Sequence, residues 1–279
     1  MAFQEGALLD GQVDLANDLS PLQGQQLAGD DRIVVETTEP PYLSALYFQM
    51  NMAIPPFDDV RVRQAFRLAC NRQAMLDTVL FGQGEIGNDM FSLGFHDYAA
   101  DIPQRPFDPD EARRLLAEAG AEGMSVPLLT GPESPGMVEA ATLYAQQLGD
   151  VGVDVTINEL PAGQLFADFE TYLSSPLVSG FTTAVPALLY YQVVFLAGGP
   201  FGLGWNRPDI DELVFAARGT ADPDERTALA VQAQRALFDE GNAIVPVFKP
   251  VVTGRVPGLT GIAEGLFEQY PSFSEARLA

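Results

Sequence analysis

The chain has 279 residues, 47% of them hydrophobic and 10% aromatic, which is the composition of a folded globular protein with a large core. The formal net charge of −23 repels phosphate backbones and excludes nucleic acid as a partner. The apolar run at 188–197 is too short to span a membrane, and the single cysteine, Cys70, permits neither an internal disulfide nor a cysteine metal site.

The acidic residues are scattered and not gathered in blocks, so they predict a solvated surface, with attraction of cationic ligands as the alternative. No cluster of soft ligands is present, and we expect no side-chain metal site and no cofactor.

The first fifty residues contain extended segments at 33–37 and 43–51 around a short helical segment at 19–28. Neither extended segment has an obvious partner nearby in the sequence.

A helix is predicted in "PFDDVRVRQAFRLACNRQAMLDTVLFG", because Asp58 or Asp59 can cap it and apolar residues recur every three and four positions. The pattern breaks near Asn71. The helix runs directly into "FGQGEIGND", which matches the dinucleotide-binding pattern G-x-G-x-x-G. That pattern works only between a strand and a helix. Here a helix precedes it and a loop follows, so these glycines are predicted to end the helix and to permit tight turns.

The next helix has a complete set of start and stop signals. Asp108 is the expected N-cap, Pro109 takes the first helical position, Glu111 closes a capping box and Gly120 ends the helix. A strand at 124–131, a helix at 136–152 and a strand at 153–160 follow. Joined by short links, they predict a right-handed βαβ unit with parallel strands.

The rest of the chain continues the alternation of helices and strands that is typical of a mixed α/β fold. Asp222 and Pro223 repeat the arrangement of a cap followed by proline. The predicted elements are a helix at 162–173, a strand at 176–185, a glycine-rich loop at 195–209, helices at 209–219 and 222–241, and a strand pair or one long extended segment at 243–256.

The segment "MNMAIPPFDDVRVRQAFRLACNRQAMLDTVLFGQGEIGND" resembles the ABC-transporter solute-binding proteins of the dipeptide, oligopeptide and nickel-binding family (extracellular solute-binding protein family 5). The family pattern is an asparagine at a strand end, here Asn51, then "PF.D.RVRQA", a broken helix and "G.G", here Gly82 and Gly84. Later segments "FDPDEARRLLAEAG", "GVDVTINEL", "NRPDIDELVFAA" and "IVPVF" also match. The resemblance covers about residues 11–248.

The resemblance implies a longer protein with two lobes that close on a ligand, of which this chain is the C-terminal lobe. The implied fold is α/β, the second lobe of a periplasmic-binding-protein-like protein (type II, cluster C), with a mixed sheet and flanking helices. Residues 1–51 would hold the end of the first lobe and crossing strands, 52–242 the second ligand-binding lobe, and 243–279 the return strands. The large N-terminal lobe would precede Met1, and so would any signal segment. The implied location is periplasmic or extracytoplasmic.

The implied function is capture of a small solute between two lobes and its delivery to an ABC permease in the membrane. In peptide-binding members, an aspartate in a segment of the type W-x-A-D-Y-x-D-P takes the peptide amino group. The corresponding segment here is "GFTTAVPALLYY", and no carboxylate lies between Glu170 and Asp209. A desolvated amino group without a counter-ion is costly. This favours a neutral or anionic solute, or a peptide bound in another way.

The candidate ligand contacts come from this segment, the glycine-rich loop and the loop after the glycines. Core packing is the alternative for the aromatic candidates, although the tryptophan would offer a stacking platform. A surface position or a satisfied structural one is the alternative for the histidine. The candidates are Phe181, Thr182, Thr183, Tyr190, Tyr191, Trp205, Asn206 and His96.

Two other classes of function compete with solute binding. A Ser-His or Cys-His hydrolase could use only His96 or Cys70, and no G-x-S-x-G turn is present. A pair of carboxylates could serve a glycosidase, although nothing in their spacing indicates one. A stand-alone lobe could instead be an interaction module that associates with itself through strands that normally cross to a partner. The sequence predicts no enzyme.

Overall fold

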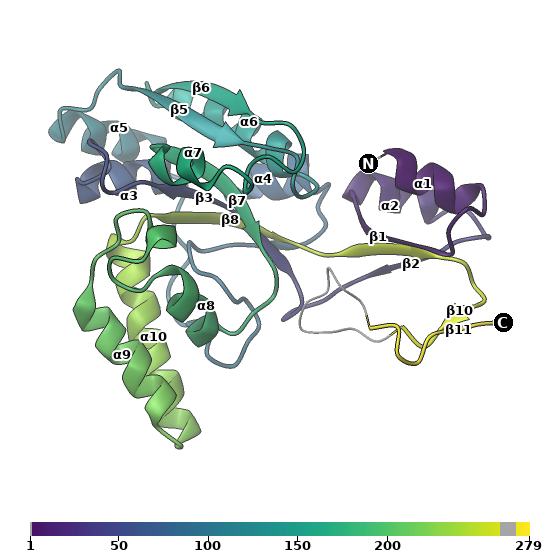
Figure 1. Ribbon diagram of the computed structural model, residues 1–279. Coiled ribbons are helices and arrows are strands. Elements are labelled where there is room, and N and C mark those ends of the chain that lie inside the picture. The colour runs from purple at the N-terminus through teal and green to yellow at the C-terminus, as the bar shows by residue number, and fades with distance from the viewer. Residues whose placement is uncertain (1, 263–271) are drawn as a thin grey trace.

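The computed structural model describes residues 2–262 and 272–279. A six-stranded sheet with helices on both faces makes up most of the molecule, and two extended segments lead from it to a smaller sheet near the two chain ends (Figure 1). Within the described residues, no helix combines the length and the hydrophobicity needed to cross a bilayer.

The larger sheet is mixed, as predicted. Its strand order is β4-β8-β3-β7-β5-β6; β5 pairs in parallel with β6 and β7, and the other pairs are antiparallel. The predicted parallel strands of the βαβ unit are therefore confirmed. The strands are β3 (Ser44–Met50), β4 (Glu85–Ile86), β5 (Ser125–Thr130), β6 (Asp154–Glu159), β7 (Leu177–Thr182) and β8 (Ala243–Lys249).

The two faces of this sheet have separate cores. Along β3, Leu46 and Phe48 face helices α3 to α6, whereas Ala45 and Tyr47 face helices α8 to α10. This is the period-two alternation of a strand, and β3 is buried at every residue because both faces are covered. The helices are α3 (Val60–Leu68), α4 (Arg72–Val79), α5 (Pro109–Glu118), α6 (Met137–Asp150), α7 (Phe169–Ser174), α8 (Ala187–Val194), α9 (Pro208–Gly219) and α10 (Pro223–Glu240), with a 3-10 turn η1 (Pro200–Gly202).

The smaller part has its own sheet and its own core. Strands β1 (Leu15–Leu19) and β2 (Val34–Thr37) both pair antiparallel with β9 (Val252–Arg255). Helices α1 (Ala2–Leu9) and α2 (Pro21–Leu27) lie against this sheet, and the core residues are Leu8, Ala16, Leu19, Leu27, Ile33 and Val252. A further pair, β10 (Leu259–Thr260) with β11 (Arg277–Leu278), lies beside it.

The early strands find their partners far along the chain. Ser44 at the start of β3 pairs with Lys249 at the end of β8, and Met50 pairs with Leu177 in β7. The segment predicted as a strand pair or one extended piece is two strands, β8 and β9, which belong to different sheets.

Most local signals predicted from the sequence are confirmed. The Asp59 side chain caps α3 and the Asn71 side chain caps α4, which accounts for the break in the helix. Gly82 and Gly84 have positive φ angles of 76° and 123°, as expected for turns that end a helix. No helix follows these glycines; the two-residue strand β4 does.

Some local predictions are wrong. Asp108 caps α5 through the Glu111 N–H, but the capping box does not close, because the Glu111 carboxylate binds Arg114 instead. The helix predicted at 162–173 begins only at Phe169, where Asp168 caps it. Helices α1 and α8 were not predicted from the sequence, and α8 lies between the strand predicted at 176–185 and the loop predicted at 195–209.

Candidate functional site

One edge of the six-stranded sheet collects the ends of several strands. The parallel strands β5, β6 and β7 all end there, β3 begins there and β8 ends there. Both connections to the smaller sheet leave from the same edge (Figure 1). Ligands of α/β proteins bind outside the carboxyl ends of parallel strands, so this carboxyl edge is the candidate site.

The loops at this edge are fixed by side chains. The Glu133 carboxylate accepts hydrogen bonds from the N–H groups of Gly163 and Leu165, both at 3.0 Å, and so joins the loop after β5 to the loop after β6. Inside the edge, the Ser179 hydroxyl donates to Thr130 Oγ1 at 2.7 Å. These hydrogen bonds fix the geometry of the edge.

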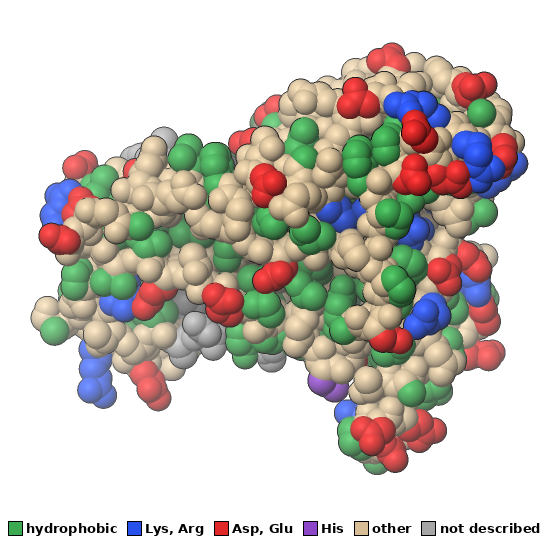
Figure 2. Space-filling view, turned by 180° about the vertical axis from the view of Figure 1, so that it is seen from behind, with side chains coloured by type: hydrophobic (Ala, Val, Ile, Leu, Met, Phe, Trp, Pro, Cys, Tyr) green, Lys and Arg blue, Asp and Glu red, His purple; other side chains and the backbone are tan. Residues whose placement is uncertain are grey.

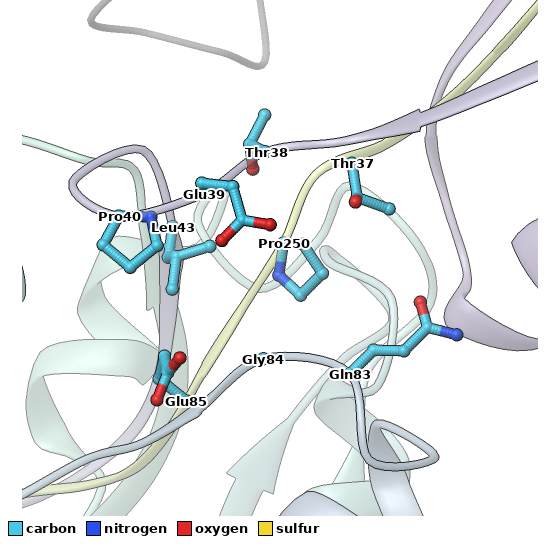
Figure 3. Close-up of a pocket in the computed structure, with 9 residues that line it drawn as sticks. All are labelled: Thr37, Thr38, Glu39, Pro40, Leu43, Gln83, Gly84, Glu85 and Pro250. Atoms are coloured by element: carbon cyan, nitrogen blue, oxygen red, sulfur yellow. The ribbon is translucent and has the colours of Figure 1, made fainter.

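Two crossing segments, 38–43 and 250–251, connect the two sheets. A pocket of about 350 Å³ opens where they pass the turn formed by Gly82 and Gly84 (Figure 3). It is mostly polar, and the carboxylates of Glu39 and Glu85 line it from opposite segments. Because Glu85 pairs with Phe248 at the end of β8, the pocket belongs to the carboxyl edge. The lining residues are Thr37, Thr38, Glu39, Pro40, Leu43, Gln83, Gly84, Glu85 and Pro250.

Three of the predicted contacts, Phe181, Thr182 and Thr183, lie at this edge and are half-buried. Phe181 packs on Phe166 with the ring centroids 6.0 Å apart. The Thr182 hydroxyl donates to the Thr183 carbonyl at 3.3 Å. The structure brings these three residues together at the end of β7, next to the loop that leads into α8.

The two predicted tyrosines belong to α8, and their side chains lie in the core. Tyr190 packs against Phe91 with the ring centroids 4.2 Å apart and the rings tilted by 35°, and Tyr191 is 2% exposed. Burial raises the pKa of both hydroxyls well above 10. Their position therefore agrees with core packing, which the sequence analysis gave as the alternative to ligand contact. Tyr47, which the sequence analysis did not select, lies in the same cluster, with its hydroxyl 3.5 Å from that of Tyr172.

Trp205 and Asn206 lie at the opposite edge of the sheet. The preceding residue, Gly204, contacts Met52 and Ala53, just beyond the end of β3, about 20 Å along the strand from Ser44. Trp205 is 1% exposed and packs edge-on against Phe195. This corrects the expectation of an open stacking surface, since the indole fills the core between α8 and α9.

Asn206 is exposed and lines a separate hollow at that opposite edge. Its distance from the carboxyl edge follows from the pairing of β3 with β7 and β8, which no local pattern reveals. His96 is exposed on the loop between β4 and α5, which agrees with the surface position given as the alternative to ligand contact. The neighbouring Asp97 is 1% exposed and holds the start of α8.

The charged groups of the interior serve to hold loops and helix ends. Asp89 pairs with Arg72 at 2.6 Å and with Arg105 at 2.7 Å. Burial alone would raise the pKa of Asp89, but these cations outweigh it and the pKa is lowered. Acidic side chains are scattered over the face shown in Figure 2, several beside arginines. Among the residues described, no group of three or more His, Cys, Asp or Glu side chains is placed to hold a metal ion.

The "RVRQAFR" motif is built into this framework. Arg63 donates to the carbonyls of Glu240 and Gly241, and Arg67 donates to those of Leu237 and Phe238. These carbonyls lie at the C-terminal end of α10, where cations and donors are favourable. The motif therefore attaches α3 to α10, and its arginines are structural.

The family model of bacterial extracellular solute-binding proteins, family 5 (middle region), matches residues 4–191, which is more than half of the chain. The chain belongs to this family. The resemblance predicted from the sequence is thus confirmed, and the family consists of binding proteins rather than enzymes.

Curated relatives extend the match. The probable di/tripeptide-binding protein 5 of Pseudomonas aeruginosa (strain UCBPP-PA14) is 27% identical over 239 residues, 82% of this chain and 45% of the relative. The dipeptide-binding protein of Escherichia coli (strain K12) is 27% identical over 231 residues, 78% of this chain and 43% of the relative. The chain spans less than half the length of these relatives.

Solved structures show the same fold. A dipeptide-binding protein from Pseudoalteromonas sp. SM9913 in complex with Met-Leu superposes with a TM-score of 0.83 at 23% identity, over 100% of this chain and 56% of the other. The binding protein AgaA from A. tumefaciens R10, in complex with agropinic acid, superposes with a TM-score of 0.87 at 19% identity, over 100% of this chain and 58% of the other. The predicted type II binding-protein architecture is thereby confirmed.

Proposed function

We propose that this chain is one lobe of the substrate-binding component of an ABC importer, and that it captures a small organic solute at the carboxyl edge of its six-stranded sheet. Family membership is the observation that carries this proposal. The edge geometry supports it, because the crossing segments leave from the edge at which β7 ends. Closure would then bring the first lobe over that edge. A ligand that fits the closed form better than the open form would shift the population towards the closed form.

The lobe boundaries belong to the proposal. We assign the six-stranded sheet and its helices to the solute-binding lobe, and the smaller sheet of β1, β2 and β9 to the neighbouring lobe. Each group has a core of its own, which supports the division. The location follows the family, which is extracellular, and the proposed membrane partner is an ABC permease.

The proposed contacts are Phe181, Thr182 and Thr183 at the end of β7. The other aromatic candidates are buried and pack in the core, where they position α8. They are Tyr190, Tyr191 and Trp205. The end of β7 presents two hydroxyls and an aromatic ring, without a carboxylate. Beside the end of β7, such a surface suits a neutral or anionic group of the solute. The dipeptide and agropinic acid complexes of the relatives set the size range to test.

Native mass spectrometry of the complete gene product, purified without added ligand, tests the solute class. We expect a retained small molecule of neutral or anionic character. A retained cationic molecule, or a peptide whose free amino group is essential for binding, would contradict the class proposed here.

Calorimetric titration with dipeptides, sugars and organic anions then tests the contacts. Thr182→Val keeps the side-chain shape and removes the hydroxyl, and we expect it to weaken binding about tenfold, which is about 1.4 kcal/mol. The matched control is Asn206→Ala at the opposite edge, which should leave the affinity unchanged. The reverse pattern would place the solute at the other edge. The isolated lobe should bind weakly, because the opposing lobe supplies the remaining contacts.

A further inference from the structure

Lys249 is the only lysine of the chain, and its ammonium group is buried at the end of β8 with 2% exposure. Its Nζ lies 2.6 Å from Oδ1 of Asp18, which belongs to β1 of the smaller sheet. In residues 2–262 and 272–279, this is the only ion pair that joins the two sheets. It therefore ties the solute-binding lobe to its neighbour at the point of crossing.

Two hydrogen bonds join the crossing segments between the pair Thr37–Val252 of the smaller sheet and the pair Ser44–Lys249 of the larger one. Between the two crossing segments, the Val251 N–H donates to Thr38 Oγ1 at 2.9 Å and the Thr38 N–H donates to the Val251 carbonyl at 3.2 Å. Pro250 has no N–H and interrupts the ladder between β8 and β9. The pocket of about 350 Å³ lies directly beside these segments and separates them from the turn at Gln83 and Gly84 (Figure 3).

The position of Asp18 is specified by an irregularity in β1. Its φ angle is +53°, and the pairing of β1 with β9 shifts register between Ala16 and Leu19. A non-glycine residue in this region costs free energy and persists only where its surroundings impose it. Asp18 lies within this register shift of β1, and from there its carboxylate reaches the buried ammonium group of Lys249.

We propose that the pair Lys249–Asp18 is a latch that sets the angle between the smaller sheet and the six-stranded sheet, and thereby the geometry in which the two lobes meet over a solute. A buried ammonium separated from its carboxylate loses far more than an exposed one. The pair thus opposes every rotation at Pro250 that would pull the two groups apart. Its role in closure rests on the proposed function, whereas its effect on the angle does not.

Spin labels placed on either side of the crossing measure this angle. Gln26 on α2 and Ala117 on α5 are exposed positions for introduced cysteines. Burial raises the pKa of the Cys70 thiol to about 12, so the native chain serves as the labelling blank. Double electron–electron resonance on the full chain, without solute, then gives the distance distribution between the labels.

We expect Lys249→Met and Asp18→Asn each to broaden this distribution and shift its mean. The matched control is Arg255→Met, which breaks the ion pair with Glu36 inside the smaller sheet and should leave the distribution unchanged. If Lys249→Met fails to fold, Asp18→Asn still decides, because Asp18 is 25% exposed and water can reach it. An unchanged distribution in the folded variants overturns the latch.

Because no solute is present in this measurement, the latch and the importer proposal fail separately. A shifted distribution in a protein that captures no solute would leave the latch standing and refute the proposed function. An unchanged distribution in a protein that does capture a solute would leave the proposed function standing. It would also mean that the backbone alone sets the angle between the sheets.

Discussion

The carboxylate of Asp97 accepts a hydrogen bond from the backbone N–H of Leu188 at 3.2 Å and closes the N-terminal end of α8 from a loop 91 residues away. A second, longer bond of 3.4 Å comes from Ala187. The backbone of Asp97 is itself held by Gln234 of α10, whose amide donates to the Asp97 carbonyl at 2.5 Å. The residues that follow β7 at the candidate site therefore take their position from α10 through this loop.

Replacing Asp97 with alanine should destabilise the protein by about 2–4 kcal/mol, because a buried charged acceptor and the helix cap are both lost. Urea unfolding followed by circular dichroism measures the change. Asp101→Asn in the same loop is the control: Asp101 is exposed and pairs with Arg235, so about 0–1 kcal/mol is expected. Equal effects of the two substitutions would show that the cap contributes nothing special.

Arg67 is fully buried, and burial lowers its pKa to about 9. Its guanidinium donates to three carbonyls, those of Leu237, Phe238 and Ala243. Arg67→Met should cost about 3–5 kcal/mol in unfolding free energy, because these acceptors lose their donors inside the core. Arg61→Met on the same helix removes an exposed pair with Asp59 and should cost less than about 1 kcal/mol. A mild effect of Arg67→Met would mean that water replaces the guanidinium.

Gly180 lies opposite Tyr47 in the pairing of β7 with β3. A Cβ added at Gly180 would lie 2.5 Å from Cζ of Tyr47, so the ring leaves no space for a methyl group. Gly180→Ala should destabilise by about 1–3 kcal/mol through overpacking. Gly149→Ala in α6, where a Cβ meets nothing within 4 Å, should instead be neutral or stabilising by up to about 1 kcal/mol. Thermal unfolding of both variants separates the steric cost from the general effect of alanine.

Helix ends could be predicted from the sequence because their causes are local. Asp59, Asn71 and Asp222 each lie two or three residues from the N–H that they cap. The capping box at Glu111 was predicted wrongly for a local reason too, since Arg114 one turn away offers the carboxylate a charged partner that the N-cap N–H cannot match.

The arrangement of the site could not be predicted in this way, because it depends on pairings distant in sequence. The order of β3 between β7 and β8 decides that Thr182 lies at the carboxyl edge while Trp205 lies at the other end. Nothing near Trp205 distinguishes an indole in an open loop from one packed on Phe195. Helix α8 was missed because its cap, Asp97, lies outside the local segment.

The buried tyrosines predict a loss of stability in alkali. Burial raises the pKa of Tyr144, Tyr172, Tyr190 and Tyr191 well above 10, and that of the Cys70 thiol to about 12. Below the pKa that tyrosine has in the unfolded chain, both the folded and the unfolded chain keep these protons, and the contribution to the free energy of unfolding is fully present. Above about pH 10, the unfolded chain releases protons that the folded chain keeps, so stability falls by up to about 1.4 kcal/mol per pH unit for each tyrosine. Burial also lowers the pKa of Arg63 and Arg67, which acts in the opposite direction, but these are two groups against several.

Tyr191→Phe isolates one of these groups. Within the residues described, the Tyr191 hydroxyl has no hydrogen-bond partner, so the substitution should leave stability at neutral pH unchanged or slightly raised. Urea titrations between about pH 8 and pH 11 should then give a shallower loss of unfolding free energy for the variant, by about 1.4 kcal/mol per pH unit above pH 10. Parallel curves for the two proteins would contradict this prediction, because they would show that the folded chain ionises Tyr191 as readily as the unfolded one despite its burial.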